Sequence, residues 1–170
     1  MMRPMVLEFP EQMGVKDLDM QYMLGDSILV APIFREDGVG EYYLPEGQWT
    51  HLISGEAREG GRWYRESYDY FSMPVFVRDN TLLAIGSNEK LPDYDYTKDL
   101  ELHLYALSDG AETVCRIPDL SGRIVMTAKV VRLGDTITFE TDCSEKKPVL
   151  VIHGMAEVTR VEGDVKVERK

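Results

Sequence analysis

The chain has 170 residues, of which 44% are hydrophobic, so it can bury the core of one medium-sized domain or of two small ones. Its formal net charge is -11, from 30 acidic and 19 basic residues, and the acidic residues are spread along the chain. A surface this acidic repels the phosphates of nucleic acids, which argues against a nucleic-acid partner.

The first residues do not have the form of a secretory signal. A short apolar run at 5–7 is interrupted by Glu8 and Pro10. No stretch approaches the roughly 20 apolar residues of a membrane-spanning helix, so we expect a cytoplasmic location and no membrane partner. Cys115 and Cys143 could pair in a secreted protein, but two reduced thiols fit the expected location better.

The first half of the chain shows a series of short strand patterns. Before them, Leu18, Tyr22 and Leu24 could share one helical face that Gly25 ends. The uninterrupted apolar run ILVAPI at 28–33 is typical of a strand buried on both faces. Residues 42–44 and 49–53 flank the turn Pro45-Glu46-Gly47 and predict a hairpin. Further strands are predicted at 62–65, 74–78 and 82–85.

A polar, aperiodic stretch at 87–99, SNEKLPDYDYTKD, is the best candidate for a linker. After it, strands are predicted at 100–105, 123–131, 135–141 and 148–153, and a last hairpin at 157–170 has Gly163-Asp164 at its turn. We therefore expect an all-β protein of two small antiparallel β-sandwich units.

The residue types that carry most chemistry are scattered. His51, His103 and His153 each lie in a predicted strand without a second ligand at metal-binding spacing, so we expect no metal site. Asp93 and Asp95 are close in sequence, but the predicted linker lacks the rigid frame that a catalytic carboxylate pair requires. No dinucleotide or phosphate loop is present, and no cofactor is expected.

Aromatic residues gather in the first half. Trp49, Trp63 and Tyr64 could stack on sugar rings, because aromatic rings are flat, rigid and carry a polar edge. The same residues could instead fill the core of a sandwich. From the residue pattern alone, both interpretations stay open.

Four stretches occur in an order known from one enzyme family. They are MRPMVLEFPEQ at 2–12, DMQYMLGDSILVAPIF at 19–34, YYLPEGQW at 42–49 and MPVFVRDNTLLAIG at 73–86. Together they resemble the C-terminal region of glycoside hydrolase family 31, closest to its bacterial α-xylosidases. The resemblance continues more weakly at 102–122. One departure is Met20, where the family more often has arginine.

The resemblance implies a domain organisation. Residues 1–24 would be a remnant of the last strand and helix of a (β/α)₈ barrel, residues 25–88 a proximal β-sandwich, and residues 89–170 a distal one. It also implies retaining hydrolysis of α-xylosides or α-glucosides by two barrel aspartates that no residue here matches, so no catalytic residue is assigned. We expect an accessory region of carbohydrate metabolism, inactive alone, whose partner is the catalytic barrel.

Because a barrel closes by pairing its last strand with its first, residues 1–20 are expected to be disordered or docked in a non-native way in the isolated chain. Tyr22, Met23, Leu24 and Asp26 are the candidates for contacting the barrel. The alternatives are a stand-alone carbohydrate-binding module and a purely structural β-sandwich pair. Exposed coplanar aromatics would favour the module, and a large apolar patch around Tyr22–Leu24 would favour the accessory region or the structural pair.

Overall fold

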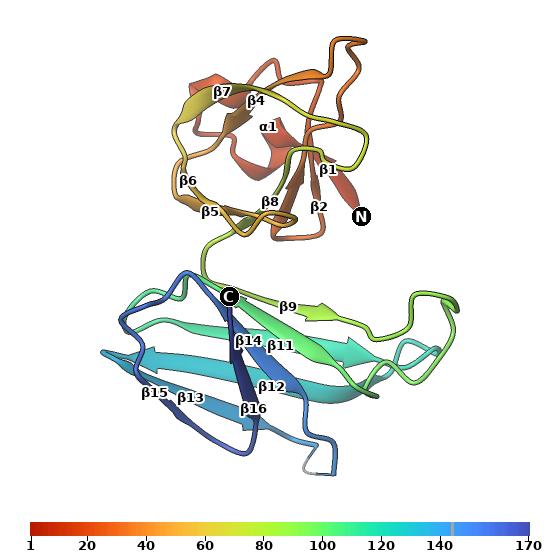
Figure 1. Cartoon of the computed structure of the whole chain (residues 1–170), viewed down its shortest axis with the longest axis vertical. Coiled ribbons are helices and arrows are strands. Elements are labelled where there is room, and N and C mark those ends of the chain that lie inside the picture. The colour runs from red at the N-terminus through yellow and green to blue at the C-terminus, as the bar shows by residue number, and fades with distance from the viewer. Residues whose placement is uncertain (144) are drawn as a thin grey trace. The chain divides into compact units, whose positions relative to one another are not determined.

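The regular secondary structure of the protein is almost entirely strand, and the strands fall into two compact units. The computed structural model describes residues 1–143 and 145–170. These divide into unit 1, Met1–Asp79, and unit 2, Asn80–Lys170 (Figure 1). None of the helices in the described residues combines the length and the apolar character that crossing a membrane requires. The predicted all-β class is confirmed.

Unit 1 contains a six-stranded sheet in the order β1-β2-β3-β8-β5-β6 and a separate pair, β4-β7. Its elements are β1 (Met2–Pro4), α1 (Met5–Glu8), the 3-10 helix η1 (Met13–Val15), β2 (Tyr22–Leu24), β3 (Ile28–Val30), β4 (Val39–Leu44), β5 (Gln48–His51), β6 (Ala57–Glu59), β7 (Arg62–Ser67) and β8 (Val75–Arg78). Its core includes Met5, Met23, Trp49 and Phe76.

The N-terminal segment belongs to unit 1. β1 pairs with β2, and β2 pairs with β3, so the segment extends the main sheet. Met5 and Val15 are buried in the same core as Trp49. The expected disorder of residues 1–20 is therefore wrong for this structure, and the alternative of a non-native docking stays a prediction. The predicted helix before Gly25 is also wrong, because Gly25, at φ +65°, makes the turn between two paired strands.

The predicted hairpin of residues 42–44 and 49–53 does not form. β4 pairs with β7, with Tyr42 opposite Tyr64, while β5 pairs with β6 and β8. The turn at Pro45-Glu46-Gly47 carries the chain from the small pair to the main sheet. The turn residues predicted that the chain turns at this point, but they did not predict which strand pairs with β4. Strand pairing depends on segments that are distant in sequence.

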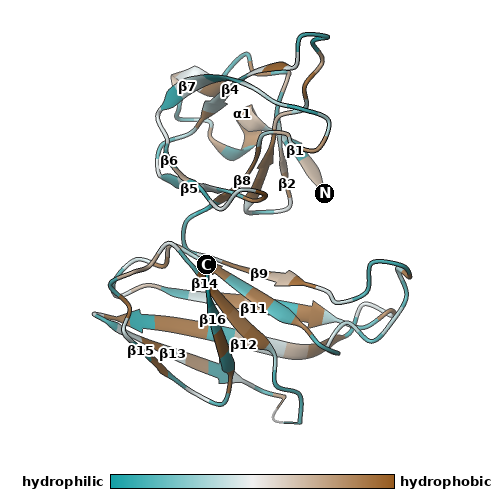
Figure 2. Ribbon diagram, in the orientation of Figure 1, coloured by the Kyte–Doolittle hydropathy of each residue, from teal (hydrophilic) through white to brown (hydrophobic). Residues whose placement is uncertain are grey.

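Unit 2 is a sandwich of two four-stranded sheets, ordered β16-β14-β10-β9 and β11-β12-β13-β15. Its strands are β9 (Thr81–Ile85), β10 (Glu101–Tyr105), β11 (Glu112–Pro118), β12 (Ile124–Leu133), β13 (Thr136–Thr141), β14 (Val149–His153), β15 (Arg160–Glu162) and β16 (Lys166–Arg169). Apolar residues recur along these strands (Figure 2). Leu102 and Leu150 from one sheet pack in one core with Met126 and Phe139 from the other.

Hairpin predictions in unit 2 had different outcomes. The hairpin of β12 and β13 is confirmed, and Gly134 in its turn has φ +61°. The last predicted hairpin is wrong: β15 pairs in parallel with β13, and β16 pairs in parallel with β14. The chain around Gly163 thus crosses between the two sheets, and Val161 of β15 and Val167 of β16, both partly buried, pack against the same core.

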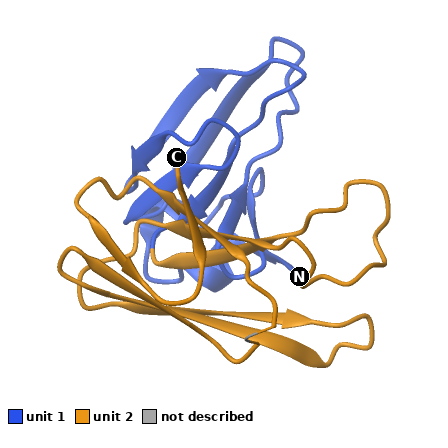
Figure 3. Ribbon diagram, turned by 60° about the horizontal axis from the view of Figure 1, so that its bottom comes forward, with its two compact units in different colours: residues 1–79 blue, residues 80–170 orange. Residues whose placement is uncertain are grey.

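The division between the units differs from the predicted boundary at 88/89. The structure divides the chain between Asp79 and Asn80 (Figure 3). The reason is β9, which pairs with β10 along its whole length and so joins unit 2. Residues 1–24, predicted as a separate remnant, share the sheet and core of unit 1.

Candidate functional site

Exposed apolar side chains concentrate in the N-terminal segment. Seven large ones lie within the first 24 residues, and we call them the N-terminal apolar surface: Met1, Met2, Val6, Leu7, Met13, Met20 and Leu24. Met2, 66% exposed, lies directly opposite Leu24, 43% exposed, in the pairing of β1 with β2. Paired residues project from the same face of a sheet, so these two form a continuous apolar area at its edge.

The predicted barrel-contacting residues divide according to the alternation of β2. Leu24 is exposed and Tyr22 is half-buried, whereas Met23 points inward and is completely buried in the core of unit 1. Successive side chains of a strand point to opposite faces, so Met23 cannot share a surface with its neighbours. Met23 is therefore a core residue in this structure, and Tyr22 and Leu24 stay candidates for a contact surface.

A cluster of charges lies beside this surface. The guanidinium of Arg3 donates to the carboxylate of Asp26 and to the carbonyl of Gly25, both at 2.9 Å, and pairs with Glu8 at 2.9 Å. Arg78 donates to Glu8 and to the carbonyl of Asp26. The side chain of Asp26 is largely exposed despite its ion pair. The cluster connects α1, the β2–β3 turn and β8, and it leaves Asp26 accessible to a partner.

Trp49, one of the three predicted sugar-stacking residues, is a core residue. Its side chain is 2% exposed, and its indole nitrogen donates to the carbonyl of Pro45 at 2.8 Å. Phe9 packs edge-on against its ring at 6.4 Å. Burial leaves Trp49 no free face for a sugar, so the sandwich-filling alternative describes this residue.

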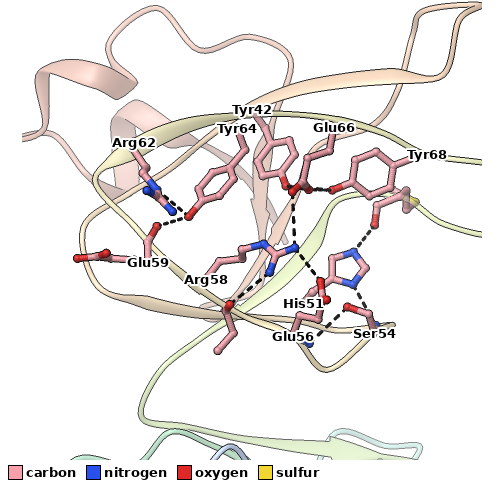
Figure 4. A network of polar contacts seen from close by, with 12 residues as sticks. Tyr42, His51, Ser54, Glu56, Arg58, Glu59, Arg62, Tyr64, Glu66 and Tyr68 are labelled. Atoms are coloured by element: carbon pink, nitrogen blue, oxygen red, sulfur yellow. Dashed lines mark hydrogen bonds and ion pairs between the residues drawn. The ribbon is translucent and has the colours of Figure 1, made fainter.

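Tyr64 and Trp63 have different surroundings on β7. Tyr42 stacks on Tyr64 with ring centres 5.6 Å apart, and the Tyr64 hydroxyl accepts from Arg62 at 2.9 Å and donates to Glu59 at 2.7 Å (Figure 4). Trp63 points to the other side, is 58% exposed and tilts against Tyr43 at 5.7 Å. Of the three predicted stacking residues, only Trp63 has substantial free ring surface.

A polar network that the sequence did not indicate lies beside Tyr64. The carboxylate of Glu66 accepts hydrogen bonds from the hydroxyls of Tyr42 and Tyr68, each at 2.8 Å, and lies 3.5 Å from Arg58 (Figure 4). Burial alone would raise the pKa of Glu66, but these hydrogen bonds and the charge of Arg58 hold it below its usual value. Burial raises the pKa of Tyr68 to about 12.

This arrangement supports structure rather than catalysis. The lowered pKa keeps Glu66 ionised at neutral pH, so it has no proton to give, and its Oε2 already accepts from two tyrosine hydroxyls while its Oε1 lies 3.5 Å from Arg58. The network ties β7 to β4 through Tyr42. One pattern could have indicated it: Arg62, Tyr64, Glu66 and Tyr68 alternate along the chain, which places them on one face of a strand.

Comparison with known proteins identifies the parts of the chain. Residues 1–83 match the model of the glycosyl hydrolase family 31 C-terminal domain. Residues 95–170 match the model of the C-terminal domain of alpha-xylosidase YicI. The first match covers unit 1 and extends into the first residues of β9, and the second match lies within unit 2.

Individual relatives agree with these matches. The alpha-xylosidase XylQ of Lactiplantibacillus pentosus is 37% identical over 176 residues, which cover 94% of this chain and 23% of XylQ. The cycloalternan-forming enzyme of Listeria monocytogenes, solved with a pentasaccharide substrate, matches 78% of this chain and 13% of its own with a TM-score of 0.66 and 29% identity. The alpha-xylosidase Xac1773 of Xanthomonas citri, at 22% identity, shares the fold over 89% of this chain and 18% of its own, with a TM-score of 0.71.

Proposed function

Because this chain belongs to glycoside hydrolase family 31 and spans its C-terminal domains, we propose that it supports the catalytic domain of a retaining α-glycosidase of the α-xylosidase type. The chain spans 23% of the length of XylQ, so the activity concerned is that of a larger assembly. We include in this proposal a role in carbohydrate metabolism and a cytoplasmic location. Two free thiols, Cys115 and Cys143, support the location, because the cytoplasm keeps thiols reduced.

The observation that carries the proposal is the N-terminal apolar surface. Surface apolar residues usually occur singly, whereas here they gather on one short segment that also holds the exposed Leu24 beside Met2. Covering such an area with another protein surface removes it from water and stabilises the contact. Asp26, exposed at the margin, would add a polar contact that sets the orientation.

A first test pairs this chain with a separately expressed catalytic domain. The partner would be XylQ without the region that aligns with this chain. We expect the two to form a stoichiometric complex in analytical ultracentrifugation at micromolar concentration, and we expect the complex to hydrolyse p-nitrophenyl α-xyloside faster than either part alone. Hydrolysis by the full chain alone, abolished by a single carboxylate substitution, would contradict the accessory role.

A pair of variants locates the contact. Leu24→Asp places a carboxylate in the apolar area, where burying an unpaired charge is costly, so we expect at least about tenfold weaker association. Leu133→Asp is the control, because Leu133 is also an exposed leucine (68%, against 43% for Leu24) but lies at the β12–β13 turn in unit 2. Equal association by both variants would show that the N-terminal apolar surface is not the contact.

Sugar binding in unit 1 is not part of this proposal. Of the predicted stacking residues, only Trp63 has substantial exposed ring surface. The ring plane of its neighbour Tyr43 is inclined by 59° to that of Trp63, so the two rings are not coplanar. A platform of coplanar exposed rings, the feature that would favour a stand-alone module, is not formed by the predicted residues.

A further inference from the structure

A cleft in unit 2 combines aromatic walls with paired charges. Its volume is about 700 Å³, within the range of small-molecule sites of roughly 300–1,000 Å³. The residues that line it come from the connection between β9 and β10, from the β11–β12 turn, and from the chain after β13. All of them belong to unit 2, so the cleft is formed within one compact body.

One wall of the cleft is aromatic. Tyr94 and Tyr96 stand perpendicular to each other with ring centres 5.0 Å apart. The hydroxyl of Tyr96 donates to the carbonyl of Pro92 at 2.8 Å, which fixes that ring. Tyr94 lies over Gly86, where a Cβ atom would come within 1.7 Å of the tyrosine hydroxyl. A glycine at position 86 thus makes room for the ring.

Two exposed apolar side chains, Leu120 and Val125, also line the cleft, and we call them the lip. Leu120, 64% exposed, lines the cleft from the β11–β12 turn, and Val125, 43% exposed, lines it from the start of β12. Exposed leucine and valine, together with the two tyrosines, give the cleft surfaces that favour contact with an apolar face of a ligand.

The charged side chains that line the cleft are two acidic and two basic ones. Asp95 accepts from the amide and hydroxyl of Thr97, at 3.1 and 2.5 Å, and pairs with Lys146. Asp119 accepts from the amide of Ser121 at 2.8 Å and from the guanidinium of Arg123 at 3.0 Å. These hydrogen bonds and ion pairs hold the pKa of both carboxyls at about 2, so both are ionised at neutral pH.

Two carboxylates and two cations leave the cleft without excess charge. An anionic ligand such as a phosphate would meet Asp95 and Asp119, and a cation would meet Lys146 and Arg123. A neutral molecule with many hydroxyls fits better, because each hydroxyl can donate to a carboxylate and accept from an ammonium or guanidinium group.

We propose that this cleft binds a neutral pyranose sugar or a short oligosaccharide of such units. One face of a pyranose ring carries C–H groups that would lie against Tyr94 and the Leu120 lip, while its hydroxyls reach Asp119 and Arg123. The site is separate from Trp63, and the assignment does not depend on the proposed contact with a catalytic domain.

The test is a titration of the full ¹⁵N-labelled chain with maltotriose, isomaltotriose, cellotriose and xylobiose at millimolar concentration, followed by NMR. We expect at least one sugar to shift the amides of residues 94–97 and 119–125. Inorganic phosphate is the anionic probe, and it should leave these amides unshifted. Shifts by phosphate alone, or shifts by none of the sugars, would overturn the proposal.

Three variants locate the binding. Tyr94→Ala removes one ring and should weaken the affinity at least about tenfold. Leu120→Asp changes only the exposed lip, so it tests the cleft even if Tyr94→Ala fails to fold, and it should also weaken binding. Trp63→Ala in unit 1 is the control and should bind normally. Unchanged affinity in the folded cleft variants would refute the assignment.

Discussion

The side-chain amide of Gln21 forms two hydrogen bonds with the backbone of Tyr43. Its nitrogen donates to the Tyr43 carbonyl at 2.8 Å, and its oxygen accepts from the Tyr43 amide at 2.8 Å. Gln21 is 4% exposed, so these bonds are shielded from water. The amide thus acts as a strand partner for β4 and joins the N-terminal segment to the small β4-β7 pair.

Replacing Gln21 with alanine should destabilise unit 1 by about 2–4 kcal/mol. The variant leaves a buried backbone amide and a buried carbonyl unpaired, and each costs about 1–3 kcal/mol. Urea unfolding followed by tryptophan fluorescence measures this, because both tryptophans, Trp49 and Trp63, are in unit 1.

Gln12 provides the matched control for Gln21. Its side chain accepts a single exposed hydrogen bond from the amide of Glu46 at 3.1 Å, which water can replace. Gln12→Ala should therefore cost less than about 1 kcal/mol. Similar losses for the two variants would show that the bonds to Tyr43 do not stabilise the unit specifically.

Gly60, between β6 and β7, should not tolerate a side chain. A Cβ atom there would lie 1.7 Å from the carbonyl oxygen of Pro45 and 2.9 Å from that of Gly47. Both are backbone atoms and cannot rotate away, so Gly60→Ala should cost at least about 3 kcal/mol or prevent folding.

Gly55→Ala is the comparison variant, because it introduces backbone strain without a steric clash. Gly55 has φ +75° but nothing within 4 Å of its Cβ position, so only the left-handed conformation is penalised, by about 1–2 kcal/mol. The two variants can be compared by the same fluorescence-detected unfolding. A larger loss for Gly55→Ala than for Gly60→Ala would contradict the packing described here.

Glu66→Ala should reduce the stability of unit 1 by about 2–3 kcal/mol. The change removes the acceptor of the Tyr42 and Tyr68 hydroxyls, and both tyrosines are half-buried or buried. Glu36→Ala, at an exposed position, serves as the control and should be within about 0.5 kcal/mol of the parent. Equal urea midpoints for all three proteins would show that the network contributes nothing to stability.

A second buried network gives unit 2 a pH dependence. His103 lies 2.9 Å from His153 through Nδ1 and Nε2, and 2.8 Å from the carboxylate of Glu101. The ring of Tyr105 stacks on His153 at 4.5 Å. Burial, followed by the nearby His103 and Lys170, lowers the pKa of His153 from 6.5 to about 4.

Since folding lowers the pKa of His153, the unfolded chain binds a proton at this residue more readily than the folded one. The stability that depends on a neutral His153 is therefore fully present above pH 6.5 and is lost as the pH falls towards 4. The shift corresponds to about 3 kcal/mol. Hydrogen exchange of the β10 and β14 amides between pH 7 and 4.5 should show this loss after correction for intrinsic exchange rates. His153→Gln should flatten the profile, and a parent-like profile in that variant would assign the effect to other groups.

The strongest sequence inferences were those that depended on local pattern. The β12–β13 hairpin was predicted because two alternating segments flank a turn with glycine, and a short loop leaves the flanking strands little choice of partner. The β4–β7 pair and the separation of β15 from β16 were missed, because such pairings join segments that composition and periodicity do not connect.

The candidate site was only partly predictable. A contact role for the stretch around Tyr22–Leu24 is a prediction from the sequence, but the alternation that buries Met23 and exposes Leu24 follows from the strand conformation of β2. Trp49 and Trp63 are both tryptophans on strand patterns, and their burial differs because one faces the core and the other faces away from it. The Glu66 network and the Tyr94 cleft each bring together segments that lie apart along the chain.

The sequence by itself determined the family, the all-β class and the position of most strands, because motif order, apolar runs and turn residues are local properties of the chain. The tertiary structure decided which strands pair, how residues 1–24 enter unit 1, and which aromatic and charged groups stay accessible. The physical reason is that a side chain's function depends on burial and on its neighbours, and both are set by contacts between distant segments, such as that of Gln21 with Tyr43.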